Sequence, residues 1–127
     1  RIGVLGLAYK ANTDDMRGAP SIEVINLLLQ GGATVKAYDP AAMDTGRDIF
    51  GDSIDLCTTP HQVAEDADAL VLVTEWDEFL NMDMERLKGL MSRPILVDGR
   101  NLFEPPMMAH LGFEYHSIGR VKVGEVS

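Results

Sequence analysis

The feature that most constrains the fold is an unbroken apolar run at residues 69–73, within the segment Asp-Ala-Leu-Val-Leu-Val-Thr. A strand exposed on one side alternates apolar and polar residues, whereas this run presents apolar side chains to both sides. We therefore predict a strand that is covered on both faces, as in a parallel sheet between two layers of helices.

Strand and helix patterns alternate along the rest of the chain. Thr59 and Pro60 are typical of a helix cap and a first helical residue, and residues 41–52 are predicted to form a polar, partly helical connection. The order indicates an α/β fold, with a doubly wound, mainly parallel sheet of about six strands and helices on both faces, similar to a Rossmann fold. Further strands are predicted at residues 2–7, 34–38, 53–57, 94–97 and 113–118, and helices at residues 20–30, 61–66, 83–91 and 105–111.

The composition is that of one globular domain, with 46% hydrophobic and 24% charged residues among 127. We assign residues 1–119 to the domain and residues 120–127 to a C-terminal tail. The net charge of −9 disfavours nucleic acid and anionic membranes as partners. Cys57 is the only cysteine and no apolar run is long enough to span a membrane, so a cytoplasmic location is expected. Because the chain opens on a strand, we expect it to be a fragment of a longer protein.

Three predicted strands are followed by unusual polar or aromatic residues. The first strand ends in residues 6–10, the fourth in residues 74–76 and the fifth in residues 98–101. Ligands of a doubly wound sheet bind beyond the carboxyl ends of its strands, where the strand order reverses, and we expect these three ends to meet there. Lys10 and Arg17 lie between the first strand and the first helix, so the sequence predicts a phosphate or nucleotide ligand.

Two interpretations stay open for the cations that follow the first strand. Lys10 and Arg17 either face a diphosphate or are surface charges, with Arg17 paired to Asp14 or Asp15. We expect the two carboxylates to orient Arg17 and to cap the turn rather than to act as acid or base.

Arg100 is a further candidate for binding an anion. It follows Gly99, which allows a tight turn that directs the guanidinium into the cleft, where its fork matches a phosphate. The alternative is an ion pair between Arg100 and Asp98. Glu75 and Trp76 either line the same cleft or, in the case of Trp76, cover the edge of the sheet.

The remaining candidates are given structural roles. Asp39 ends the second strand, where an acid can hold a ribose in a dinucleotide fold, but Gly3-x-x-Gly6 lacks the G-x-G-x-x-G pattern. We therefore interpret Asp39 as the cap of a turn into Pro40. Cys57 is interpreted as a small buried residue rather than a nucleophile. The three histidines lack metal-ligand spacing, so no metal site is expected.

Several motifs occur together in a characteristic order. With them the chain resembles the C-terminal, UDP-binding domain of the UDP-glucose/GDP-mannose dehydrogenase family, and most of all its UDP-glucose 6-dehydrogenases, over residues 1–119. Tyr9 stands where phenylalanine is common in the family. The motifs are Gly6-Leu-Ala-Tyr-Lys10, Asn12-Thr-Asp-Asp-Met-Arg17 with Ala19-Pro-Ser21, Tyr38-Asp-Pro40, Thr74-Glu-Trp76 and Asp98-Gly-Arg-Asn101.

The resemblance implies part of an enzyme that oxidises UDP-glucose to UDP-glucuronate in two NAD-dependent steps. Tyr9, Lys10 and Arg100 match positions that bind the UDP-sugar, and Arg17 matches one that reaches NAD on another domain. Backbone amides of residues 6–10 are expected to add phosphate donors. The family's NAD-binding domain, catalytic thiol and dimer-forming helices lie upstream. The resemblance therefore implies that domain as a partner and a homo-oligomeric enzyme, and this chain alone is expected to be inactive and to hold no catalytic residue.

Three other interpretations stay open. An independent NAD-binding domain is one, although the missing glycine pattern counts against it. A signalling receiver domain would need an aspartate after the third strand and a lysine after the fifth, where Cys57-Thr58 and Gly99-Arg100 stand. The third is a dehydrogenase of the same family that acts on UDP-N-acetylmannosamine or GDP-mannose.

Overall fold

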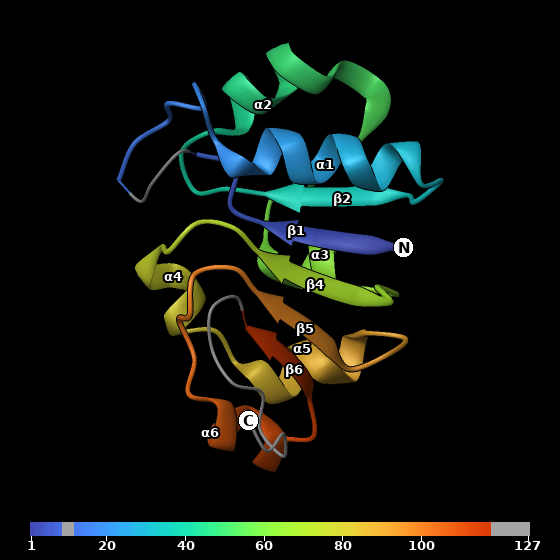
Figure 1. Cartoon of the computed structure of the whole chain (residues 1–127), viewed down its shortest axis with the longest axis vertical. Helices are drawn as coiled ribbons and strands as arrows, with labels where there is room; N and C mark the ends of the chain where they lie inside the picture. Colours follow the sequence, from blue (N-terminus) through green and yellow to red (C-terminus); the bar gives the residue numbers. More distant parts are fainter. Residues whose placement is uncertain (9–11, 118–127) are drawn as a thin grey trace.

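A six-stranded parallel sheet with the order β3-β2-β1-β4-β5-β6 forms the centre of the molecule. The computed structural model describes residues 1–8 and 12–117. The labelled strand arrows all point the same way (Figure 1). The order reverses between β1 and β4, whose carboxyl ends therefore flank the switch point. The strands are β1 (Ile2–Leu5), β2 (Val35–Tyr38), β3 (Asp55–Leu56), β4 (Ala69–Leu72), β5 (Ile95–Asp98) and β6 (Glu114–Ser117).

Helices cover both faces of this sheet. They are α1 (Pro20–Gln30), α2 (Met43–Phe50), α3 (Pro60–Ala64), α4 (Asp77–Leu80), α5 (Met84–Leu90) and α6 (Pro105–His110), with a 3₁₀ turn η1 (Gly51–Ser53) after α2. One core cluster joins α3, α4, α5 and α6 to the sheet, and a second joins α1 and α2 to it. Leu5 lies in the first cluster and Val4 in the second, as the alternation of a strand requires. The doubly wound α/β fold expected from the sequence is thus confirmed.

Local sequence signals explain several helix ends. Helix α1 begins at Pro20 and ends before Gly31. The Thr59 hydroxyl caps α3 by accepting a hydrogen bond from the Gln62 amide at 3.2 Å, and Pro60 is the first helical residue, as predicted.

Several element ends lie one or two residues from the sequence-based expectations, and the end of β1 and two helices need an explanation. β1 ends at Leu5 because Gly6 turns with φ at 100°, and the next two amides bond to a side chain instead of a strand. The connection at 41–52 contains the full helix α2. Helix α4 has only four residues, too few to produce an apolar period in the sequence. The expected tail at 120–127 lies outside the described residues.

Within residues 1–8 and 12–117, no helix combines the length and the apolar character that crossing a bilayer requires.

Candidate functional site

Buried polar side chains gather at one edge of the sheet. Among the described residues they are Ser21, Asp39, Thr74 and Asp98, each at most 1% exposed. Asp39, Thr74 and Asp98 stand at the carboxyl ends of β2, β4 and β5, and Ser21 stands in the first turn of α1. Burying a polar group costs free energy unless it is hydrogen-bonded, so the partners of these side chains show what they hold in place.

Asp39 accepts hydrogen bonds on both of its carboxylate oxygens. Oδ1 accepts from the amides of residues 41–42 at 2.8 and 2.9 Å, which is the turn cap expected from the sequence. Oδ2 accepts from the amides of Leu7 and Ala8 at 2.8 and 3.0 Å and from Trp76 Nε1 at 3.1 Å. The turn cap is therefore only part of its role, because Asp39 also ties the end of β1 to the segment after β4.

Two hydroxyl groups hold the same end of β1 from other directions. The Ser21 hydroxyl donates to the Leu7 carbonyl at 2.6 Å, and the Thr74 hydroxyl donates to the Ala8 carbonyl at 2.8 Å. The first bond comes from α1 and the second from the end of β4. The backbone that leaves β1 is thus fixed by side chains from both neighbouring strands and from the helix that follows it.

This network corrects, for residues 6–8, the expectation that the amides of residues 6–10 offer donors to a phosphate, whereas residues 9–10 lie outside the described residues. The Gly6 amide donates to the Tyr38 carbonyl at 2.8 Å, and the next two amides donate to Asp39. These three amides bond inside the protein because the strand order places β2 beside β1 and so brings Asp39 against the turn. A phosphate at this edge must therefore depend more on side-chain cations.

Arg100 reaches this edge from the loop after β5. Its amide donates to Asp98 Oδ1 at 2.9 Å, and its Nη2 donates to Glu75 Oε1 at 2.8 Å. The ion pair considered between Arg100 and Asp98 is therefore wrong, because Asp98 holds the backbone and Glu75 holds the guanidinium. Asp98 Oδ2 accepts from the Phe103 amide at 3.1 Å and from the Tyr115 hydroxyl at 2.6 Å, which fixes the loop that carries Arg100.

A cavity of about 370 Å³ opens beside Arg100. Apart from Arg100, its lining side chains are apolar, so the guanidinium is the group there that can attract an anion. Trp76 is half-buried and packs against the first core cluster, so it covers the sheet edge, one of the two roles considered for it. The lining residues are Pro20, Val24, Val71, Leu72, Val73, Val97, Gly99 and Arg100.

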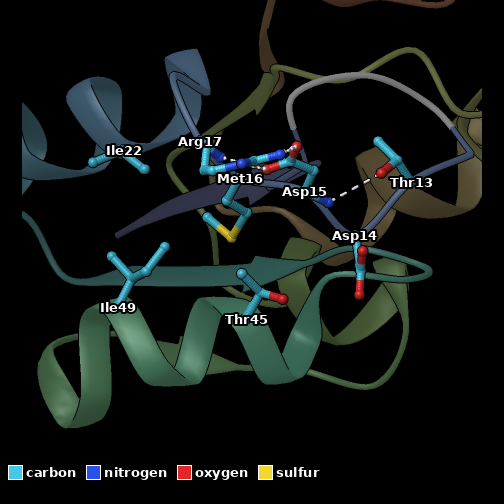
Figure 2. A pocket seen from close by; sticks show the side chains of 8 residues that line it. All are labelled: Thr13, Asp14, Asp15, Met16, Arg17, Ile22, Thr45 and Ile49. Carbon is cyan, nitrogen blue, oxygen red and sulfur yellow. Dashed lines mark hydrogen bonds and ion pairs between the residues drawn. The ribbon is translucent and has the colours of Figure 1, made fainter.

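Arg17 lies at a different groove, of about 650 Å³. Figure 2 shows its side chain against Asp15, with Ile22 of α1 and Thr45 and Ile49 of α2 around them. Arg17 Nη2 lies 2.9 Å from Asp15 Oδ2, and its side chain is 93% exposed. Hydrogen bonds from the Arg17 side chain and from its backbone amide, with the charge of the guanidinium, lower the pKa of Asp15 to about 2. The expectation that Asp14 and Asp15 orient Arg17 is thus confirmed for Asp15.

The predicted ligand contacts are therefore not gathered in one cavity. Arg17 and Arg100 line different cavities, and their assignment to cofactor and substrate stays a prediction. Tyr9 and Lys10, the other two predicted contacts, lie outside the described residues.

Cys57 has the properties of a structural residue. It is partly buried after β3, and burial raises the pKa of its thiol. A raised pKa lowers the fraction of reactive thiolate, the opposite of what a nucleophile needs. Among the described residues, no group of three His, Cys, Asp or Glu side chains could hold a metal ion.

Sequence reasoning missed the roles of Ser21 and Thr74. Both are hydroxyl residues at the end of an apolar segment or the start of a helix, which is a weak signal because such residues are common there. Asp98 is expected from the sequence at the carboxyl end of the fifth strand, but the partner considered for it is Arg100 alone. The actual partners of Asp98 include Tyr115, seventeen residues away in the sequence.

Comparisons with known proteins agree on one family. The sequence profile of the UDP-glucose/GDP-mannose dehydrogenase family, UDP binding domain, matches residues 3–105. The UDP-glucose 6-dehydrogenase of Rhizobium meliloti is 47% identical over 94% of this chain, and the UDP-glucose 6-dehydrogenase TuaD of Bacillus subtilis is 44% identical over 96%. The structure of a UDP-glucose dehydrogenase from Pyrobaculum islandicum matches 94% of the chain with a TM-score of 0.78 and 31% identity.

The chain corresponds to only a part of these relatives, since it spans 27%, 26% and 25% of their respective lengths. Within that part the profile match, the order of the motifs and the doubly wound sheet all agree. The chain therefore belongs to the UDP-glucose/GDP-mannose dehydrogenase family, of which it carries the UDP binding domain.

Proposed function

We propose that this domain binds the UDP part of UDP-glucose, within an enzyme that oxidises this sugar nucleotide to UDP-glucuronate in two NAD-dependent steps. One observation carries the binding: Arg100 stands at the switch-point edge, held by Asp98 and Glu75, beside an apolar cavity. A guanidinium can match the oxygens of a diphosphate with two parallel hydrogen bonds. In the described part of the chain, Glu75 engages one of its nitrogens, Nη2.

Further side chains complete the proposed diphosphate clamp. The net charge of −9 repels an anion at long range, so binding must depend on cations that are fixed close to the ligand. Lys10 and Tyr9 match the family positions that bind the UDP-sugar, and they follow the Leu7–Ala8 backbone that Asp39 holds. The clamp proposed here therefore consists of Lys10, Tyr9 and Arg100.

Binding the nucleotide at this domain would place the sugar for reaction elsewhere in the enzyme. Binding energy from a remote part of a substrate can position its reacting atom, here the C6 alcohol, against catalytic groups of the other domain. The chain spans about a quarter of its relatives' length, which leaves room for that domain. Closure of the cleft between the two parts is part of this proposal, as is the homo-oligomeric enzyme that the family resemblance implies.

NAD is proposed to bind to the other part of the enzyme rather than to this domain. The first turn here lacks the dinucleotide glycine pattern, and the amides of Leu7 and Ala8 bond to Asp39 instead of facing a pyrophosphate. Arg17 would reach the cofactor from its separate groove. The 127-residue chain alone is accordingly proposed to have no dehydrogenase activity. The names of the relatives at 47% and 44% identity support UDP-glucose as the substrate.

Calorimetric titration of the intact dehydrogenase with UDP tests the clamp. We expect Arg100→Ala and Lys10→Ala each to weaken binding about tenfold or more, because each removes a charge-assisted contact with the diphosphate. Arg93→Ala is the matched control, because Arg93 is exposed and precedes β5, at the opposite edge of the sheet. The proposal fails if Arg100→Ala and Lys10→Ala bind UDP as tightly as the Arg93→Ala control.

A further inference from the structure

A chain of polar contacts links Asp39 to Arg100 along the carboxyl edge of the sheet. Trp76 Nε1 donates to Asp39 Oδ2 at 3.1 Å, and the neighbouring Glu75 accepts from Arg100 Nη2 at 2.8 Å. β2 and β4 lie on either side of β1, so Trp76 reaches across the end of β1 to its acceptor. The contacts therefore connect the ends of β2, β4 and β5.

Asp39 suits this place because it is a carboxylate. It is fully buried, and its two oxygens accept from four backbone amides and one indole N–H of the described residues. An asparagine offers one acceptor oxygen, and its amide nitrogen would point two further N–H groups at donors. The arrangement thus depends on both oxygens of Asp39, which is more than a turn cap requires.

The position of the Trp76 ring depends on Asp39, because the ring is held both by packing and by its hydrogen bond to Asp39. It packs against the first core cluster and hydrogen-bonds to Asp39. Glu75 is the preceding residue, so a displacement of Trp76 also displaces the carboxylate that holds Arg100. The Arg100 backbone is fixed separately by Asp98, which leaves Glu75 to set the direction of the guanidinium.

We propose that Asp39 is a positioning residue for the diphosphate clamp. Through Trp76 it sets the loop after β4, and through Glu75 in that loop it orients the guanidinium of Arg100. The inference rests on the proposed function, because it takes Arg100 as a diphosphate contact.

The first test is an NMR measurement on the 127-residue chain that needs no ligand. Asp39→Asn disturbs the acceptor, and Trp76→Phe keeps an aromatic ring but removes the indole donor. We expect both variants to shift the Arg100 Nε–H signal. Leu87→Ala is the matched control, because it opens a cavity in the first core cluster and lowers stability but removes none of these hydrogen bonds. An Arg100 signal that stays in place in Asp39→Asn overturns the inference.

The second test is UDP affinity, measured by calorimetry at a temperature where every variant is folded. We expect Asp39→Asn to weaken UDP binding about tenfold, the order of one lost charge-assisted hydrogen bond, and Leu87→Ala to leave the affinity unchanged. Equal affinities of Asp39→Asn and Leu87→Ala would overturn the positioning role while the proposed function stands. Absence of UDP binding by both the unmodified chain and the intact dehydrogenase would overturn the proposed function and, with it, this assignment.

Discussion

The two edges of the sheet differ in how deeply their polar side chains are buried and in what those side chains bind. At the amino edge, Arg1 Nη1 lies 3.5 Å from Asp66 Oδ2, and the two side chains are 60% and 63% exposed. At the carboxyl edge, Asp39 and Asp98 are fully buried and hold backbone amides of neighbouring loops. Exposed ion pairs contribute about 1 kcal/mol at most, whereas a buried donor left without its acceptor costs about 1–3 kcal/mol.

The difference shows where the molecule needs fixed geometry. A site that positions ligand contacts requires side chains whose own places are locked by packing and hydrogen bonds. Buried polar networks supply such rigidity, but they are costly when a partner is missing. Matched substitutions at the two edges can therefore test whether the carboxyl edge is the constrained one.

The largest effect is expected from Gly6→Ala at the carboxyl edge. Gly6 has φ at 100°, and an added Cβ would lie 2.5 Å from Thr74 Cβ and 2.6 Å from its amide nitrogen. Gly32, at the amino edge, has φ at 88°, but no described atom lies within 4 Å of its added Cβ. We expect losses in unfolding free energy of about 4 kcal/mol or more for Gly6→Ala and about 1 kcal/mol for Gly32→Ala. Urea denaturation measures both, and similar losses would contradict the contrast between the edges.

The next effect compares two Asp→Asn substitutions. Asp98→Asn places an N–H group either beside the Phe103 amide and the Tyr115 hydroxyl or beside the Arg100 amide, so we expect a loss of about 2–3 kcal/mol. Asp66→Asn removes one exposed charge, and asparagine tolerates the positive φ of 60° at this position. Its expected change stays within about 0.5 kcal/mol. Equal shifts of the denaturation midpoint in Asp98→Asn and Asp66→Asn would mean that burial of Asp98 adds nothing to the stability cost of the substitution.

A smaller difference in stability is expected between two Ser→Ala substitutions. Ser21→Ala removes a buried donor at 2.6 Å from the Leu7 carbonyl, and we expect it to lower stability by about 1–2 kcal/mol. Ser92→Ala removes an exposed donor at 3.2 Å from the Asp66 carbonyl, with an expected loss below about 0.5 kcal/mol. Thermal unfolding followed by circular dichroism distinguishes them, and a larger loss for Ser92→Ala would reverse the comparison.

The smallest effect concerns Arg17 and Asp15, which belong to the carboxyl side of the molecule but are not buried. The pKa of Asp15 falls from 3.8 to about 2 in the folded chain, so the linked stabilisation is complete above pH 3.8 and is lost as the pH falls toward 2. Arg17→Ala removes the side-chain hydrogen bond and the charge but keeps the backbone amide bond to Asp15, so the pKa should rise part of the way toward 3.8 in a carboxyl NMR titration. Arg93→Ala should leave it low. An Asp15 pKa that stays at about 2 in Arg17→Ala would show that the guanidinium is not what lowers it.

Short-range patterns were sufficient for most of the fold. The apolar run at 69–73 predicted β4, and Thr59 with Pro60 predicted the start of α3. These signals depend on residues a few positions apart, so they can be read without knowing the tertiary structure. Helix α4 has only four residues and offers no such period, and α2 was recognised only as a partly helical connection.

The amino-acid sequence by itself determined the alternation of strands and helices, the family, and the three segments that meet at the carboxyl edge. Only the tertiary structure decided how Asp39, Glu75 and Asp98 are used. The Leu7–Asp39, Glu75–Arg100 and Ala8–Thr74 bonds join residues 32, 25 and 66 positions apart. The physical reason is that such bonds depend on which strands become neighbours, and the order of strands in the sheet is set by packing of the whole domain.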